Sequence, residues 1–238
     1  MNRAMILFGL QHIISLPSFP LFCAYLLMIF LSKLWQKWTK PLNLKPLMLL
    51  HNFTCCVASM YTLYGFIKGL YNSDYIYSRT KTEELSFVYW VYWMTKIIEL
   101  LDTVFMVLRH RQRQISFLHV YHHASMLLFS NIGYKYFPYP NIAIFLVLNS
   151  LVHVVLYFYY GLTAVMPNNP PRWRKQLTQM QILQFLLDFV LSSYGYMYHN
   201  FCYYGLIYGI SMTYLFSNFY YRAYVRQKKQ PEDKLKSN

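Results

Sequence analysis

The sequence predicts an all-α membrane protein with seven transmembrane helices, and three observations carry this prediction. Of the 238 residues, 56% are hydrophobic and 20% aromatic, whereas only 13% are charged. That balance is too apolar for an ordinary soluble domain of this length. Seven windows are apolar and long enough to cross a bilayer, which takes about 20 residues. The loops between these windows alternate between rich and poor in Lys and Arg.

The seven windows follow one another closely and leave little chain for a soluble domain. They cover approximately residues 13–32, 47–69, 85–108, 117–134, 140–163, 177–198 and 201–221. The first window contains Pro17 and Pro20 and runs into LSKLWQKW without a small-residue cleavage pattern. We therefore expect it to remain as a span rather than to be a removed signal peptide. The sequence predicts one transmembrane domain over residues 1–238, ending in a basic tail at 226–238.

Basic residues predict how the chain is oriented. Sixteen of the 22 Lys and Arg residues lie in four alternate segments, which are 33–46, 109–116, 164–176 and 222–238. Because cytoplasmic loops are enriched in Lys and Arg, we expect a lumenal N-terminus and a cytosolic C-terminus. The net charge of +14 is then mainly a topology signal. A basic cytosolic face would also attract anionic lipid head groups or a phosphate-bearing substrate, and nucleic acid is not an expected partner.

Ionisable side chains inside predicted spans are the first candidates for function, because they are costly in lipid. In KIIELLDT of the third window, Lys96, Glu99 and Asp102 fall within an arc of about 120° on a helix. In HVYHH of the fourth window, His119, His122 and His123 also share one face. The charged face either pins neighbouring helices through ion pairs or belongs to a site. Three histidines on one face favour a site.

Two further windows each carry a polar stripe. The stripes consist of Asn149, His153, Tyr157 and Tyr160 in the fifth window, and of Thr178, Gln181, Gln184 and Asp188 in the sixth. Tyrosines alone would fit an interfacial aromatic belt, and amides also join membrane helices to one another. With a rise of 1.5 Å per residue, however, the polar groups of all four windows lie at similar depth in the cytosolic half. We therefore predict one site, opening toward the basic loops.

The basic loops RHRQRQ and PRWRKQ would place Arg109, Arg172 and Arg174 around the mouth of this site. An apolar compartment below a cationic rim suits a substrate with an apolar tail and an anionic head. Two chemistries use histidines and carboxylates in this setting. One is a di-iron site, which also uses H-x-x-H-H but needs about eight histidines in several boxes. The other is acyl transfer by a neutral histidine.

Histidine count favours acyl transfer and no bound metal. The chain has eight histidines in all, and His12, His51, His110 and His199 are scattered outside the two motifs. Cysteine adds no metal motif, because Cys23, Cys55, Cys56 and Cys202 show no zinc-like spacing. A non-enzymatic acyl-CoA carrier or receptor with seven spans remains an alternative. A His122→Ala variant that still binds acyl-CoA but has lost turnover would favour the enzyme over this alternative.

Four motifs, in order, resemble those of the ELO family of very-long-chain fatty acid elongases. KIIELLDTVF is similar to K-x-x-E-x-x-D-T-x-F, HVYHH to H-x-x-H-H, and TQMQILQF to T-x-x-Q-x-x-Q-F. NSLVHVVLYFYY is similar to N-x-x-x-H-x-x-M-Y-x-Y-Y, with Leu156 in place of Met. The resemblance covers residues 33–225. No second cysteine stands near the start of the third window to pair with Cys202, as it does in some relatives.

The resemblance implies a very-long-chain 3-oxoacyl-CoA synthase of the endoplasmic reticulum, with six of its seven helices enclosing an acyl tunnel. The reaction would condense acyl-CoA with malonyl-CoA and need no cofactor. Expected partners are membrane lipids, other enzymes of the elongation cycle and a second copy of the chain. HVYHH rather than HWYHH is more typical of members acting on polyunsaturated or very long chains. The ending KLKSN, with Lys234 and Lys236, resembles a dilysine retrieval signal.

We predict that His122 attacks the thioester to form an acyl-imidazole, and that His153 acts in the second half-reaction as a base or a donor. His119 and His123 would orient His122, helped by Asp102 and Glu99. A concerted route, in which an enolate attacks acyl-CoA directly, stays open. The expected substrate-binding residues are Lys96, Asn149, Tyr157, Tyr160, Gln181, Gln184, Arg109, Arg172 and Arg174.

Overall fold

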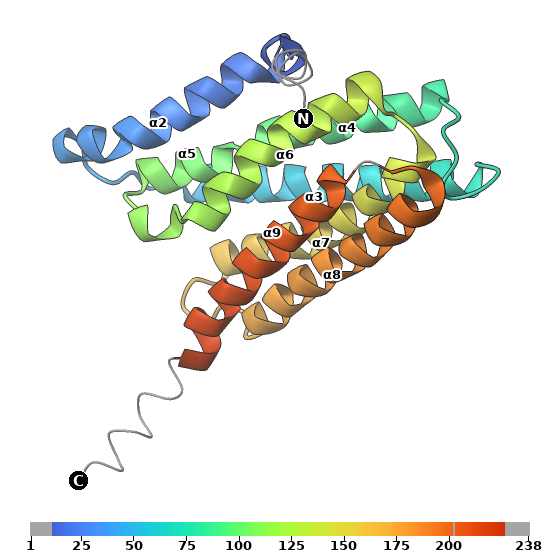
Figure 1. Ribbon diagram of the computed structural model, residues 1–238. Helices are drawn as coiled ribbons and strands as arrows, with labels where there is room; N and C mark the ends of the chain where they lie inside the picture. Colours follow the sequence, from blue (N-terminus) through green and yellow to red (C-terminus); the bar gives the residue numbers. More distant parts are fainter. Residues whose placement is uncertain (1–10, 202, 227–238) are drawn as a thin grey trace.

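The computed structural model describes residues 11–201 and 203–226, and every regular element in that part of the chain is helical (Figure 1). The main helices are α2 (Ser18–Trp38), α3 (Lys45–Tyr71), α4 (Glu83–Glu99), α5 (Leu101–Leu108), α6 (Phe117–Tyr136), α7 (Pro140–Val165), α8 (Arg174–His199) and α9 (Tyr204–Tyr220). A 3₁₀ turn, η1 (Gln112–Gln114), a π-helical turn, η2 (Tyr221–Val225), and a helical segment at residues 11–14 accompany them. The predicted all-α fold is confirmed. Cys202 and the tail after residue 226, with Lys234 and Lys236, lie outside the described residues.

The local sequence explains where several helices begin and end. The side chains of Thr82 and Ser116 cap α4 and α6, each accepting a hydrogen bond from a backbone N–H of the first turn. Proline stands in the first turn of α3 and α7, where its missing N–H costs nothing. Asn200 ends α8 in the left-handed conformation, with φ of 53°, which asparagine adopts more readily than most residues.

The third window is divided, which the sequence pattern did not predict. Leu100 separates α4 from α5. The backbone N–H groups of Leu100 and Thr103 donate to the carbonyls of Ile97 and Leu100, three residues earlier, and so tighten the turn. The first window is interrupted as well: residues 11–14 are helical, a turn follows, and α2 begins at Ser18, directly after Pro17. Pro17 occupies the N-cap position, where a proline interrupts no helical hydrogen bond.

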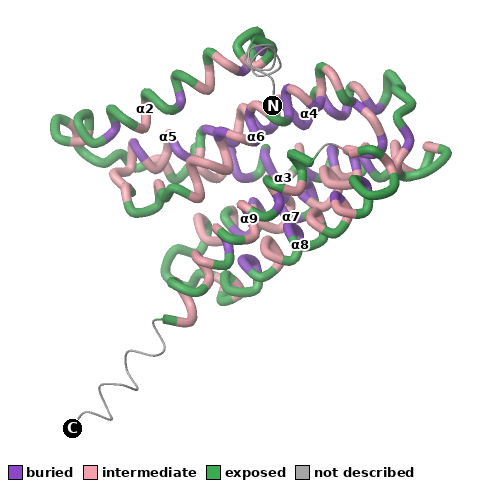
Figure 2. Tube along the Cα trace, viewed as in Figure 1, coloured by how far each residue is buried: buried purple, intermediate pink, exposed green. Residues whose placement is uncertain are grey.

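Six helices pack side by side and close into a ring. Around the ring, α3 packs on α4, α4 on α6, α6 on α9, α9 on α8, α8 on α7, and α7 again on α3. The short α5 continues α4, and α2 lies outside the ring against α6 and α5, as Figure 1 shows at the top of the view. Buried residues follow α3, α4, α6 and α7, whereas α2 is mostly exposed (Figure 2).

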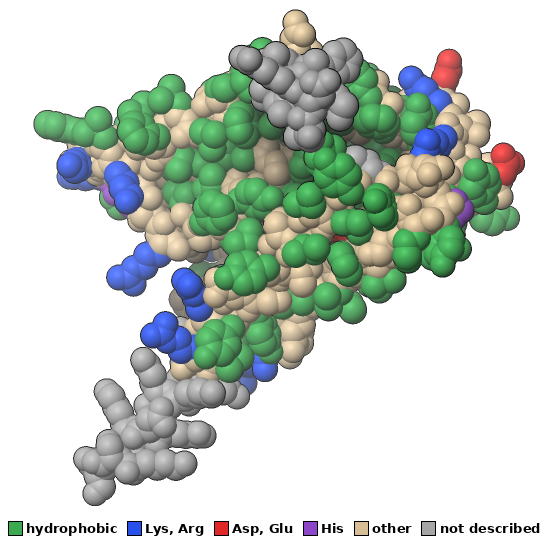
Figure 3. Space-filling view, in the orientation of Figure 1, with side chains coloured by type: hydrophobic (Ala, Val, Ile, Leu, Met, Phe, Trp, Pro, Cys, Tyr) green, Lys and Arg blue, Asp and Glu red, His purple; other side chains and the backbone are tan. Residues whose placement is uncertain are grey.

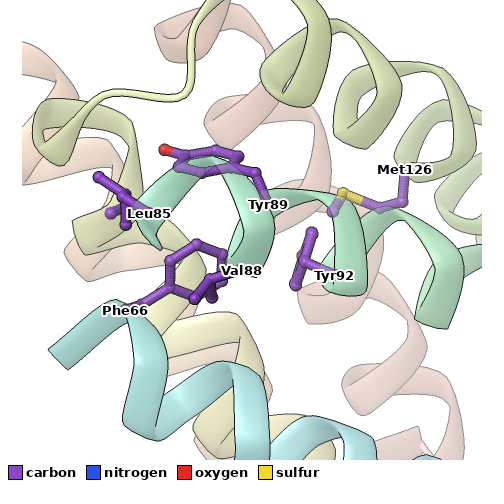
Figure 4. Packing of buried hydrophobic residues seen from close by; sticks show 7 residues of the cluster. Phe66, Leu85, Val88, Tyr89, Tyr92 and Met126 are labelled. Carbon is purple, nitrogen blue, oxygen red and sulfur yellow. The ribbon is translucent and has the colours of Figure 1, made fainter. Parts of the chain in front are cut away.

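The core at one end of the ring joins α3, α4 and α6. Phe66 of α3 packs edge-on against the rings of Tyr89 and Tyr92 of α4, with centroids 5.1 and 5.6 Å apart (Figure 4). A Cβ added at Gly65 would lie 2.6 Å from a methyl group of Val88, so that position needs a glycine for the close approach of α3 and α4. This tight aromatic packing fixes α3 and α4 against each other, and both helices carry predicted or observed site residues nearer the other end of the ring.

The outer surface is unusually apolar. Figure 3 shows hydrophobic side chains across the middle of the face in view, with Lys and Arg at its left edge and lower left, and again at its upper right beside Asp and Glu. Exposed large side chains include Phe30, Leu34 and Trp38 of α2, each more than half exposed. Two of the described helices, α2 and α7, are long and apolar enough to cross a bilayer by length and composition.

Candidate active site

A cavity of about 690 Å³ opens at one end of the ring. Its walls come from the starts of α3, α6 and α8 and from the ends of α5, α7 and α9, so helices of opposite direction bring different parts of the chain to one layer. Ten of the predicted site residues line it: Asp102, Arg109, His119, His122, His123, His153, Tyr157, Tyr160, Gln181 and Arg174. The fold therefore brings residues of all four sequence motifs to one cavity.

Three of the cavity's histidines lie in the first two turns of α6. The Ser116 cap starts the helix three residues before His119, so HVYHH turns one face of α6 toward the cavity. The rings of His119 and His123 lie 4.4 Å apart between centroids, and those of His122 and His123 5.5 Å. The His122 ring also lies 6.2 Å from that of His153 on α7. The histidines therefore form one contiguous cluster.

His122 has one nitrogen that is unpaired. Its Nδ1 is buried and has no hydrogen-bond partner among the residues that the structure describes. His122 lines the cavity, and its Nε2 is not among the buried atoms without a partner. The ring packs against Phe185 of α8, with centroids 6.5 Å apart. A histidine that lines a cavity and whose ring is held by apolar contacts is a suitable nucleophile or acceptor through Nε2.

His153 belongs to a buried ion cluster with Lys96 and Glu99 of α4. Its Nδ1 lies 3.0 Å from Glu99 Oε1 and 3.3 Å from Lys96 Nζ. The Lys96 ammonium donates to the same carboxylate oxygen at 2.7 Å and lies over the Tyr92 ring. All three ionisable side chains are at most 5% exposed. Lys96 and Glu99 do not line the cavity, and both contact His153, which does.

Asp102 forms a separate cluster, across the break at Leu100. One carboxylate oxygen lies 3.0 Å from Nε2 of His51 on α3, and the other accepts a hydrogen bond of 2.8 Å from the Tyr157 hydroxyl. His51 lines the cavity and is 6% exposed. The interpretation of His51 as a scattered histidine is therefore wrong: it is a fifth histidine of the site. Its one signal in the sequence is the polar pair His51–Asn52 inside an otherwise apolar window.

His119 is held by Thr103 rather than by a carboxylate. Thr103 Oγ1 lies 2.7 Å from His119 Nε2, and the Tyr25 hydroxyl of α2 lies 3.0 Å from the same oxygen. Thr103 is fully buried and Tyr25 is 4% exposed. Asp102 contacts His51 and Tyr157, and Glu99 contacts Lys96 and His153. That these two carboxylates help to orient His122 stays a prediction.

The cavity mouth is cationic. Arg109 and Arg174 line it as predicted, together with Lys45 and Arg113, which sequence reasoning did not select. Burial, and then the neighbouring Arg111, lower the pKa of Arg109 from its ordinary value, yet an arginine keeps its charge in proteins.

Five predicted residues do not line the cavity. They are Lys96 and Glu99, described above, and Asn149, Gln184 and Arg172. The Tyr92 hydroxyl donates to Asn149 at 2.7 Å, and Gln184 donates to Asp188 at 3.2 Å, so both amides join helices or turns. Arg172 is exposed in the loop before α8. Within the described ranges, no three His, Cys, Asp or Glu side chains are grouped to hold a metal ion.

Fold and site together define a closed helical ring around a histidine-lined cavity with a basic mouth. A family model described as the GNS1/SUR4 (ELO) family matches residues 14–232. The chain is 32% identical to very long chain fatty acid elongase 4 of Homo sapiens, over 93% of this chain and 76% of that protein. It is 35% identical to elongase 7 of Rattus norvegicus, over 81% and 75%, and 32% identical to elongase 5 of the same species, over 88% and 74%.

This chain belongs to the ELO family. The match covers nearly all of the described helices, including those that supply every wall of the cavity. Membership supports an enzyme of fatty acid elongation. Fatty acid elongation is therefore the reaction for which the histidine cluster should be tested.

Proposed function

We propose that the protein condenses a long-chain acyl-CoA with malonyl-CoA, releasing CoA and CO2 and giving a 3-ketoacyl-CoA two carbons longer. The observation that carries this proposal is the meeting of His119, His122, His123 and His153 in one cavity under a cationic mouth. Acyl transfer needs a nucleophile in a dry pocket, and CoA needs cations for its phosphates. The bonds that form and break belong to the acyl thioester, the malonyl group and His122, so the proposed reaction requires no cofactor.

In this proposal seven segments span the membrane, with α4 and α5 acting as one. The closed ring and the apolar outer surface support it, since exposed Leu, Phe and Tyr side chains on this scale suit lipid rather than water. The cavity end, with its basic loops, then faces the cytosol, where cytoplasmic loops gather Lys and Arg. The C-terminus lies on that same side and the N-terminus faces the lumen.

The acyl chain would run from the cavity into the interior of the ring. An apolar cluster of Phe185, Met212 and Phe216 lies directly beyond His122, between α8 and α9. Each methylene buried there would contribute about 0.8 kcal/mol. The length of this path would limit the product, and substrates with very long or polyunsaturated chains are the proposed class.

The first half-reaction forms a covalent intermediate. Nε2 of neutral His122 attacks the thioester carbon and the carbon–sulfur bond breaks with its electron pair going to sulfur. CoA leaves as its thiolate, which takes a proton from water, while the proton on Nδ1 stays in place, so that the acylated ring is an acyl-imidazolium. The buried, unpartnered Nδ1 supports Nε2 as the attacking atom, because Nδ1 cannot reach a substrate in the cavity. An acyl-imidazole keeps the acyl carbon reactive toward a carbon nucleophile.

The second half-reaction uses the malonyl group. Loss of CO2 leaves its electron pair on the α-carbon of the CoA enolate, which attacks the acyl carbon and breaks the bond to Nε2 of His122. His153 Nδ1 lies 3.3 Å from the Lys96 ammonium, which can only donate, and 3.0 Å from the Glu99 carboxylate, which can only accept, so this nitrogen is occupied by the ion cluster in either tautomer. His153 Nε2 is then directed away from Glu99, where it steers the enolate oxygen or its proton.

Elongation of labelled acyl chains tests the proposal. Detergent-purified protein or microsomes would be incubated with labelled malonyl-CoA and a panel of acyl-CoAs, and the 3-ketoacyl products separated by chain length. We expect His122→Ala to lose turnover by more than about a thousandfold while acyl-CoA binding persists. The matched control is His199→Ala, since His199 stacks on Tyr77 outside the cavity. Binding without turnover in the wild type would instead indicate a carrier.

The proposed location is the endoplasmic reticulum membrane, in contact with its lipids, other enzymes of the elongation cycle and a second copy of the chain. Malonyl-CoA is cytosolic, so a cytosolic mouth gives direct access to it. Changing Lys234 and Lys236 to Ala in a tagged protein should let a fraction reach later compartments. If the variant stays in the endoplasmic reticulum, the retention signal lies in another segment of the chain.

A further inference from the structure

Helix α2 lies outside the ring, yet buried hydrogen bonds tie it to the helices of the site. Trp93 donates to the Ser18 hydroxyl at 2.7 Å, Tyr25 meets Thr103 at 3.0 Å, and Gln36 Nε2 donates to a backbone carbonyl of α5 at 2.7 Å. In lipid, apolar packing alone gives little preference for the bundle over the surrounding acyl chains, so polar contacts hold such a helix. Of these three contacts, the one between Tyr25 and Thr103 continues to a cavity residue.

That contact is a chain of three side chains. Tyr25, Thr103 and His119 are joined by successive distances of 3.0 and 2.7 Å. Thr103 is fully buried and Tyr25 nearly so, and both lie away from the cavity lining. The His119 ring lines the cavity and lies 4.4 Å from that of His123. A residue of the outermost helix is thereby two hydrogen bonds from the histidine cluster.

The chain has a direction. A buried tyrosine hydroxyl needs an acceptor for its proton, and Thr103 Oγ1 is the hydrogen-bond partner that the structure gives Tyr25. When Thr103 accepts that proton, its own proton points to His119 Nε2, which must then be the acceptor. The proton of a neutral His119 then lies on Nδ1. Without the Tyr25 hydroxyl, Thr103 could equally accept from a protonated Nε2 or bond back to its own helix.

We propose that Tyr25 is a positioning residue of the active site: its hydroxyl sets the polarity of Thr103 and so fixes the tautomer and orientation of His119. Packing carries this orientation to His123 and on to His122, whose ring lies 5.5 Å from that of His123. The catalytic part of the inference rests on the proposed acyl transfer at His122. The part that concerns the His119 proton does not.

The test compares two hydroxyl deletions on the same helix. Tyr25→Phe keeps the ring, which packs with Leu100, Ala124 and Leu127, and removes the hydrogen bond to Thr103. Ser18→Ala is the control, because it removes a buried hydrogen bond that also holds α2 but leads to no histidine. Thermal unfolding of each variant measures how far α2 has been loosened. The rate of His119 modification by diethyl pyrocarbonate, followed by mass spectrometry, measures how firmly its nitrogen is held.

We expect Tyr25→Phe to raise the modification rate of His119 and to slow single-turnover CoA release, each about twofold to tenfold, the range for loss of one neutral hydrogen bond. The KM for acyl-CoA should stay unchanged. Ser18→Ala should lower the unfolding temperature without either effect. Unchanged His119 reactivity in Tyr25→Phe, or equal effects of both variants, would overturn the proposal and leave Tyr25 as a tether for α2.

Two measurements keep the outcomes separate. If the wild type releases no CoA from acyl-CoA, the proposed function fails, and the His119 modification rates still judge Tyr25. If Tyr25→Phe does not fold, the ring ¹⁵N shifts of His119 in the labelled wild-type protein decide. A proton on Nδ1 supports the proposal, and a proton on Nε2 overturns it.

Discussion

Removing the ammonium of Lys96 should destabilise the protein far more than removing an exposed lysine. Lys96 and Glu99 are 3% and 1% exposed and lie 2.7 Å apart, and Glu99 Oε2 already has no partner among the described residues. Lys96→Met would leave a buried carboxylate whose remaining partner is His153. Breaking a buried pair on one side costs about 3 to 5 kcal/mol, because the surviving charge stays desolvated. We expect a loss of that size in unfolding free energy.

The assay is titration of the purified protein with sodium dodecyl sulfate, following loss of tertiary structure. The double variant Lys96→Met/Glu99→Gln removes both charges and should recover much of the loss, since no unpaired ion remains. Lys68→Met is the control: Lys68 pairs with Glu84 on the surface and should show no measurable change. A Lys96→Met protein as stable as the wild type, or a double variant less stable than Lys96→Met, would refute the buried-pair reasoning.

Three further predictions follow from particular contacts. His51→Phe should lower turnover about tenfold, because Asp102 loses one of its two hydrogen-bond partners, and elongation assays with His199→Phe as control would check it. Gly65→Ala should cost about 1 to 3 kcal/mol in unfolding free energy, since the new methyl would lie 2.6 Å from Val88, and a second change, Val88→Ala, should restore part of the loss. Elemental analysis should find no stoichiometric iron or zinc, whereas two irons per chain would revive the di-iron interpretation.

Helical periodicity and depth could predict much of the site. His119, His122 and His123 share one face of any α-helix, and the Ser116 cap leaves that face unchanged. His153 stands at a similar depth on α7, which runs in the opposite direction, so depth predicts its layer, whereas its meeting with His122 across the ring depends on the order of the helices. These positions depend on local geometry, which a sequence carries.

Other parts depend on which helices are neighbours, and a single sequence does not contain that information. Lys96, Glu99 and Asp102 read as one charged face, yet the tight turn at Leu100 directs them to different partners, His153 on α7 and His51 on α3. A lone histidine in an apolar window has no periodic companion to reveal its partner. The order of helices around the ring, with α2 outside, likewise follows from packing that no motif encodes.

The central claim is that His122 carries the acyl group, and mass spectrometry after mixing with acyl-CoA alone tests it most directly. We expect one equivalent of CoA to be released per chain and one acyl group to be found on His122, and both to be absent in His122→Ala. CoA release only after malonyl-CoA is added, with unmodified His122 throughout, would contradict the covalent step and favour direct attack of the enolate on acyl-CoA.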